Sequence, residues 1–94
     1  MVFSKDQYST ILRENRRKIM HQHFSRGLEI LFAKLKEDAM KLKPCHREAV
    51  FEIPDHLNLE AMERLICEYF QDLGYKPLKE PRKEGETKIT ITLT

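Results

Sequence analysis

The chain lacks most of the sequence patterns that identify an enzyme. It has three glycines among 94 residues, and neither a phosphate-binding P-loop nor a dinucleotide-binding glycine fingerprint occurs. There is also no nucleophile elbow of the Gly-x-Ser-x-Gly type. A chain of this length has little surface to form a substrate pocket of roughly several hundred cubic ångströms. We therefore expect a protein that is not an enzyme, without catalytic residues, cofactor or metal.

The chain is also poor in cysteine and in long apolar runs. Its two cysteines, Cys45 and Cys67, form no local pair such as Cys-x-x-Cys. The first residues show no basic region followed by an apolar stretch, so no secretory signal is visible, and no run approaches the roughly 20 apolar residues of a membrane span. These absences predict free thiols, no membrane association and a cytoplasmic location. Cys67 lies off the apolar stripe of its helix, which predicts partial exposure.

The composition is that of one folded domain with an uneven charge. Apolar residues make up 40% and charged residues 34% of the chain, which is typical of a globular protein. Because typical domains contain about 100–150 residues, residues 1–94 are predicted to form a single domain. The net charge of +2 conceals an excess of basic residues in 1–43 and of acidic residues in 44–94. The basic half can attract phosphates or an acidic protein surface.

A long helix is predicted in the first half of the chain. Ser4 and Gln7 have the spacing of a capping box, and helical composition continues without proline until Pro44. A straight helix from residue 5 to residue 42 would be about 57 Å long, whereas a domain of this size has a radius of gyration of about 12 Å. Such a helix must project beyond its domain or bend.

The apolar stripe of this segment changes face along its length. At about 100° per residue, one side carries Tyr8, Ile11, Leu12 and Ile19. A stripe on roughly the opposite side carries Phe24, Leu28, Leu31, Leu35, Ala39 and Leu42. Two arrangements satisfy the pattern. In the first, the chain kinks near residues 21–27, with Gly27 as the weak point, and both helices pack on the same core. In the second, the helix is straight and its first stripe meets another chain. In both, residues 4–20 form a possible projecting arm, and the predicted partner-binding residues are Tyr8, Ile11, Leu12 and Ile19.

Residues 44–94 are predicted to form a β-α-β-β unit. Alternating apolar residues predict strands over 48–53 and 87–94, and a short edge strand over 75–79, because Pro77 cannot donate to a ladder. Between the first two strands, Asn58 is a good N-cap and Gly74 suits the position after the helix end. The predicted fold class is α+β: a long or kinked N-terminal helix followed by this unit, with the helices on one face of a small three-stranded sheet.

Basic residues of the first helix offer an alternative binding surface. Phosphates of a nucleic acid could be contacted by Arg13, Arg16, Arg17 and Arg26. No aromatic residue is interleaved within residues 13–23, which disfavours a platform for stacking bases. His21 and His23 are two residues apart and do not face each other on a helix, so they predict no metal site.

The last strand presents a row of threonines, Thr90, Thr92 and Thr94, on its outer side. If the edge of this strand were unpaired, it could pair with a second copy of the chain and extend the sheet across a homodimer.

One segment resembles a known class of proteins. Leu73-Gly74-Tyr75, a charged loop and a final strand at residues 88–93 resemble small uncharacterised accessory proteins of tailed phages. The likeness covers about residues 57–94 and transfers no site residue. It implies a protein that binds and redirects a host macromolecule, as in host takeover or anti-defence. We therefore expect a small non-enzymatic accessory protein that binds a protein partner, or itself as a homodimer, with nucleic-acid binding as the alternative.

Overall fold

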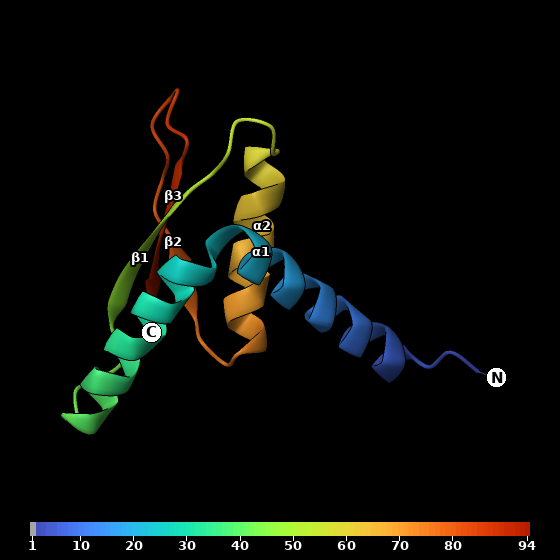
Figure 1. The fold of residues 1–94 in the computed structure, drawn as a ribbon, viewed down its shortest axis with the longest axis horizontal. Coiled ribbons are helices and arrows are strands. Elements are labelled where there is room, and N and C mark those ends of the chain that lie inside the picture. Colours follow the sequence, from blue (N-terminus) through green and yellow to red (C-terminus); the bar gives the residue numbers. More distant parts are fainter. Residues whose placement is uncertain (1) are drawn as a thin grey trace.

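The computed structural model describes residues 2–94 and places them in two helices and three strands. In chain order these are α1 (Lys5–Met40), β1 (Arg47–Glu52), α2 (Leu59–Asp72), β2 (Pro77–Lys79) and β3 (Lys88–Leu93). Figure 1 shows the long α1 crossing α2 and then running beside β1. The predicted α+β class is confirmed, with a long N-terminal helix, a second helix and a three-stranded antiparallel sheet.

The helix ends lie where local side chains stabilise them. Ser4 Oγ accepts from the backbone N–H of Gln7, and the Gln7 side chain accepts from the backbone N–H of Ser4, which confirms the capping box. The Asn58 side chain accepts from the N–H of Ala61 and so caps α2. Gly74 follows the end of α2 with φ +92°, a conformation that costs glycine little.

The sheet has the order β1-β3-β2, and both neighbours run antiparallel to β3. The prediction of an edge strand containing Pro77 is confirmed, because β2 lies at one edge. The condition for homodimer pairing through the last strand, an unpaired edge, is not met along the threonine row, because β3 is the central strand. Its threonine row lies in the central strand: Thr90 and Thr92 face β1 residues on one side, and Thr92 also pairs with Leu78 of β2 on the other. Within the chain, β1 pairs with β3 over its whole length and β2 pairs with Ile91–Leu93.

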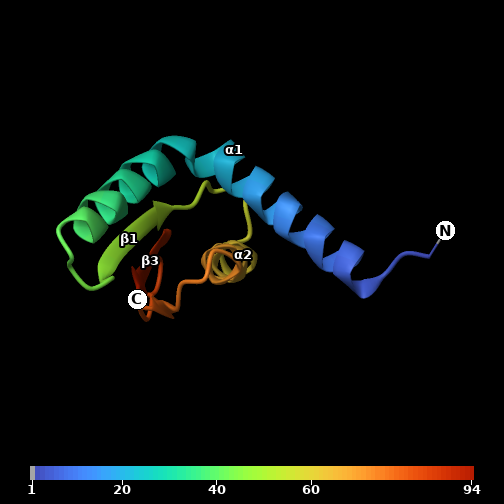
Figure 2. The ribbon, with the colours of Figure 1, turned by 90° about the horizontal axis from the view of Figure 1, so that it is seen from below.

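Helix α1 is kinked rather than straight. Phe24 has φ −133° and ψ 20°, outside the helical range, and the axis changes direction there (Figure 2). The ring of Phe24 packs edge-on against Phe51 of β1, with ring centroids 5.2 Å apart. This position lies inside the predicted interval, but the expected weak point was wrong, since Gly27 continues the helix after the break. An aromatic side chain anchored on the sheet, rather than a flexible glycine, marks the bend.

The core lies between the helices and one face of the sheet. Its residues from the sheet side are Ala49 and Phe51 of β1, Ile53 directly after β1, and Ile89, Ile91 and Leu93 of β3. Its centre is Phe70 of α2, which is completely buried. The structure differs from two sequence predictions. Cys67 is buried rather than partly exposed, because α2 is covered by the sheet as well as by α1. Leu42 lies beyond the end of α1 and is 92% exposed, so it does not extend the second apolar stripe.

The molecule is elongated by the first half of α1. Its principal extents are 47 × 38 × 22 Å and its radius of gyration is 14.7 Å, compared with about 12 Å expected for a compact chain of this length. Figure 2 shows the N-terminal part of α1 continuing away from the sheet beyond α2. Within residues 2–94, neither helix has an apolar stretch long enough to cross a membrane.

Candidate functional site

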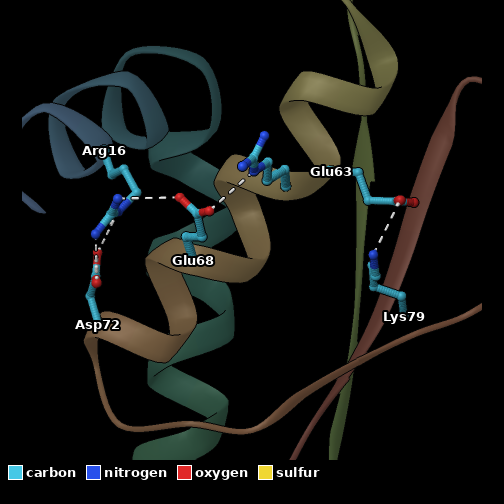
Figure 3. A network of polar contacts seen from close by, with 6 residues as sticks. Arg16, Glu63, Glu68, Asp72 and Lys79 are labelled. Carbon is cyan, nitrogen blue, oxygen red and sulfur yellow. Dashed lines mark hydrogen bonds and ion pairs between the residues drawn. The ribbon is translucent and has the colours of Figure 1, made fainter. Parts of the chain in front are cut away.

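The arm, residues 4–20, is attached to the body at its inner end. Met20 is completely buried, and Ile19 packs against the core cluster as a partly buried residue. One turn further out, the Arg16 guanidinium donates to both carboxylate oxygens of Asp72 on α2, at 2.7 and 2.9 Å (Figure 3). It also donates to Glu68, at 3.2 Å. These contacts fix the direction in which the rest of the arm leaves the body.

The two acidic partners stabilise the charged guanidinium of Arg16. The hydrogen bonds to Asp72 raise the pKa of the Arg16 guanidinium, partial burial opposes this, and the charges of Asp72 and Glu68 add to the rise. The side chains of Arg16 and Asp72 are 18% and 19% exposed. Because the ion pair between Arg16 and Asp72 is bidentate and its side chains are largely shielded from water, it holds the arm more firmly than an exposed ion pair would.

The outer part of the arm carries an apolar surface that the chain itself leaves uncovered. Tyr8 is 55%, Ile11 46% and Leu12 37% exposed. The structure thus divides the four predicted partner-binding residues: these three lie on the projecting part, whereas Ile19 belongs to the attachment. The bend at Phe24 brings Ile19 to the core but does not bring the other three with it.

Sequence reasoning missed one member of this surface. Phe3 precedes the capping residue Ser4 and is 61% exposed, and its ring packs edge-on against Tyr8 with centroids 6.4 Å apart. This is the contact of a hydrophobic staple, in which the residue before the N-cap meets the fourth residue of the helix. The spacing of Phe3, Ser4 and Tyr8 was a sufficient signal. We define the arm surface as Phe3, Tyr8, Ile11 and Leu12.

The four arginines of the alternative nucleic-acid site do not share one surface. Arg16 is engaged by α2 as described. Arg13 and Arg17 border a small cavity of about 170 Å³ against Tyr69 on α2. Arg26 lies beyond the kink and lines a different groove, between α1 and β1. The four arginines therefore lie partly on the arm and partly beyond the bend, and they do not form one continuous basic surface.

Apart from Arg16, the groups with altered proton affinity lie in the body, and none lies on the arm surface. Burial raises the pKa of the Cys67 thiol and of the Tyr69 hydroxyl. At the other end of α1, hydrogen bonds from Arg47 hold the pKa of the Asp38 carboxyl below its usual value. Over residues 2–94, no three His, Cys, Asp or Glu side chains lie close enough together to hold a metal ion.

Comparison with known proteins adds no relative to this description. No protein-family model matches the chain, and neither a curated protein nor a solved structure matches it.

Proposed function

We propose that this chain is a small non-enzymatic accessory protein that binds another protein through the arm surface. The observation that carries the proposal is the position of exposed apolar side chains on a helix that projects from the body but is firmly attached to it. Tyr8, Ile11 and Leu12 are between 37% and 55% exposed, so a large part of the arm stripe lies in water. Exposed apolar residues that gather on one projecting element are typical of an interaction site.

The geometry favours a partner that packs against a helix. The stripe follows the three- and four-residue spacing with which an amphipathic helix enters a hydrophobic groove or pairs with a second helix. Completing the burial of one such half-exposed side chain contributes about 1 kcal/mol, because full burial is worth about 1.5–3 kcal/mol. The anchored arm also loses little conformational freedom on binding, which preserves more of that gain.

The partner in this proposal is either a second copy of the chain or a host protein. Self-association would bring two arm surfaces together in a homodimer and bury both. The resemblance to tailed-phage accessory proteins favours a host protein whose activity is redirected, as in host takeover or anti-defence. Solution mass distinguishes the two partners directly.

The test compares wild type with the double variant Tyr8→Asp/Ile11→Asp. Both positions are exposed, so the variant should keep the helical circular dichroism and unfolding midpoint of wild type. We expect a concentration-dependent mass in wild type, measured by sedimentation, that the variant loses. If wild type is monomeric, we expect instead that wild-type bait captures a defined host protein and that the variant captures at least about tenfold less.

A matched variant controls for the added charge. Lys18→Asp alters an exposed position of the same arm outside the stripe and should leave association unchanged. A monomeric wild type whose captured proteins are the same for all three baits would refute the proposal. Nucleic-acid binding is the competing outcome: affinity for DNA or RNA that falls steeply with salt, and is lost when Arg13 and Arg17 are replaced by Glu, would favour it.

A further inference from the structure

A groove on the other side of the bend separates the second half of α1 from the outer edge of β1. It has a volume of about 500 Å³, within the range of peptide and ligand sites. One wall comes from α1 and includes Arg26, Gly27 and Ile30, and the other is β1 itself. None of the arm surface lines it, so this groove is separate from the proposed function.

The strand that forms the wall has unpaired backbone groups. The Ile53 N–H donates to the Thr87 carbonyl, which makes these two a hydrogen-bonded pair of the antiparallel ladder. Because such pairs alternate, Ala49 and Phe51 bond to β3, whereas the N–H and C=O groups of residues 48, 50 and 52 point to the free edge. No backbone or side-chain hydrogen bond within residues 2–94 occupies that edge. A free strand edge is a template for another strand.

The opposite edge of the sheet is less suitable. There the hydrogen bonds from Lys76 to Thr94 and from Glu80 to Thr90 place Pro77 and Lys79 on the free side of β2. Pro77 has no N–H to donate, and β2 contains three residues compared with six in β1. Strand addition is therefore favoured at β1.

The charges around the free edge differ on the two faces of the sheet. On the helix side, Arg26 and Lys34 line the groove, and neither forms an ion pair among the described residues. On the open side, the side chains of Glu48 and Glu52 flank Val50, and all three are exposed. An added strand points alternate side chains to these two faces.

We propose that the free edge of β1 binds an extended segment of another protein as a fourth strand, with acidic side chains facing Arg26 and Lys34 and basic or polar side chains facing Glu48 and Glu52. Backbone hydrogen bonds supply affinity and the alternating charges supply register and specificity. A second copy of the chain is disfavoured at this edge when the two β1 strands pair about Val50. Antiparallel pairing of two β1 strands centred on Val50 would place Glu48 directly opposite Glu52 of the partner, and like charges opposite each other are destabilising.

The probe for the test is the capped peptide Lys-Glu-Thr-Ile-Lys-Glu-Thr, whose even positions present Glu, Ile and Glu to one face. It is titrated to about 1 mM into isotope-labelled full-length protein and followed by amide NMR. We expect the amides of Glu48, Val50 and Glu52 to shift and to exchange with solvent more slowly on binding. The amides of Ala49 and Phe51 should be protected already in the free protein, because β3 bonds them.

Variants of the groove test the geometry. Arg26→Glu/Lys34→Glu should weaken peptide binding by about tenfold or more at low salt, whereas Lys36→Glu, an exposed change outside the groove, should have little effect. A side-chain β-carbon at Gly27 would meet nothing within 4 Å, so Gly27→Ala should bind normally and Gly27→Phe should fill the groove and abolish binding.

Three results would overturn the proposal. The first is no binding of the peptide to wild type at about 1 mM. The second is peptide binding that does not match the proposed site. Either the amide signals of residues 48, 50 and 52 stay unchanged, or the peptide affinity of Arg26→Glu/Lys34→Glu equals that of the control Lys36→Glu. The third is slowed exchange of these amides with protein concentration alone, which would show a second copy at the edge. Because Tyr8→Asp/Ile11→Asp leaves the groove intact, it should bind the peptide as wild type does.

Discussion

The pairing of Arg16 with Asp72 determines how firmly the arm is held, and a double-mutant cycle can measure it. We consider Arg16→Met, which keeps much of the apolar stem but removes the guanidinium, together with Asp72→Asn and the double variant. Exposed ion pairs contribute about 0.2–1 kcal/mol, and removal of one partner from a buried pair costs about 3–5 kcal/mol. With side chains 18% and 19% exposed, this pair lies between these limits.

We expect Arg16→Met to lower the free energy of unfolding by about 1.5 kcal/mol and the coupling energy of the cycle to be about 1 kcal/mol. The assay is urea unfolding of the four proteins, monitored by circular dichroism. Amide exchange should also accelerate between residues 5 and 20 in Arg16→Met, because the arm loses its contact with α2.

The same structure provides a matched control. Arg64 forms an ion pair with Glu68 at 3.4 Å within α2, but its side chain is 82% exposed. Arg64→Met should therefore cost less than about 0.5 kcal/mol. If Arg16→Met were no more destabilising than Arg64→Met, or if the coupling were indistinguishable from zero, the arm would not be anchored by this pair and the reasoning would fail.

Three further predictions concern the second half of α1, and each is measured by chemical or thermal unfolding. Leu42 has φ +57° and lies just after α1, where the backbone N–H of Leu42 donates to the Ala39 carbonyl and that of Lys43 donates to the Asp38 carbonyl. Leu42→Gly should raise the free energy of unfolding by up to about 1 kcal/mol, because glycine has no β-carbon to strain this conformation. Leu42→Ala should leave the free energy of unfolding unchanged, because alanine keeps the β-carbon. Gly27→Ala should raise it by about 0.5–1 kcal/mol, because the new β-carbon meets open space and alanine is the better helix former; an unchanged or lower stability would contradict this. Arg47 lowers the pKa of Asp38 in the folded state, so the Asp38 carboxylate stabilises the fold fully above its unfolded pKa of about 4, and this contribution is lost as the pH falls through the lowered folded pKa. Asp38→Asn should therefore be less stable than wild type at neutral pH, and the two proteins should become equally stable in acid. A stability difference that stays constant down to acid pH would refute this assignment.

Local interactions made the elements of this fold predictable. Ser4 with Gln7, Asn58 with Ala61, and Gly74 after α2 act over three or four residues, and their geometry follows from residue type and spacing alone. The alternation of the final strand identified its buried residues for the same reason. The exposed arm was also predictable in part, because an apolar stripe out of phase with the core stripe is visible in the sequence.

The remaining features depend on residues far apart in the chain. Only the fold brings Arg16 to Asp72, 56 residues later, and this contact changes Arg16 from a candidate phosphate ligand into an anchor. Only the fold sets the order β1-β3-β2, which places the threonine row in the central strand and leaves β1 with the free edge. The sequence by itself determined where helices and strands form, because hydrogen bonds and side-chain periodicity within a segment decide that. The tertiary structure decided which surfaces remain for a partner, because exposure depends on what every other segment covers.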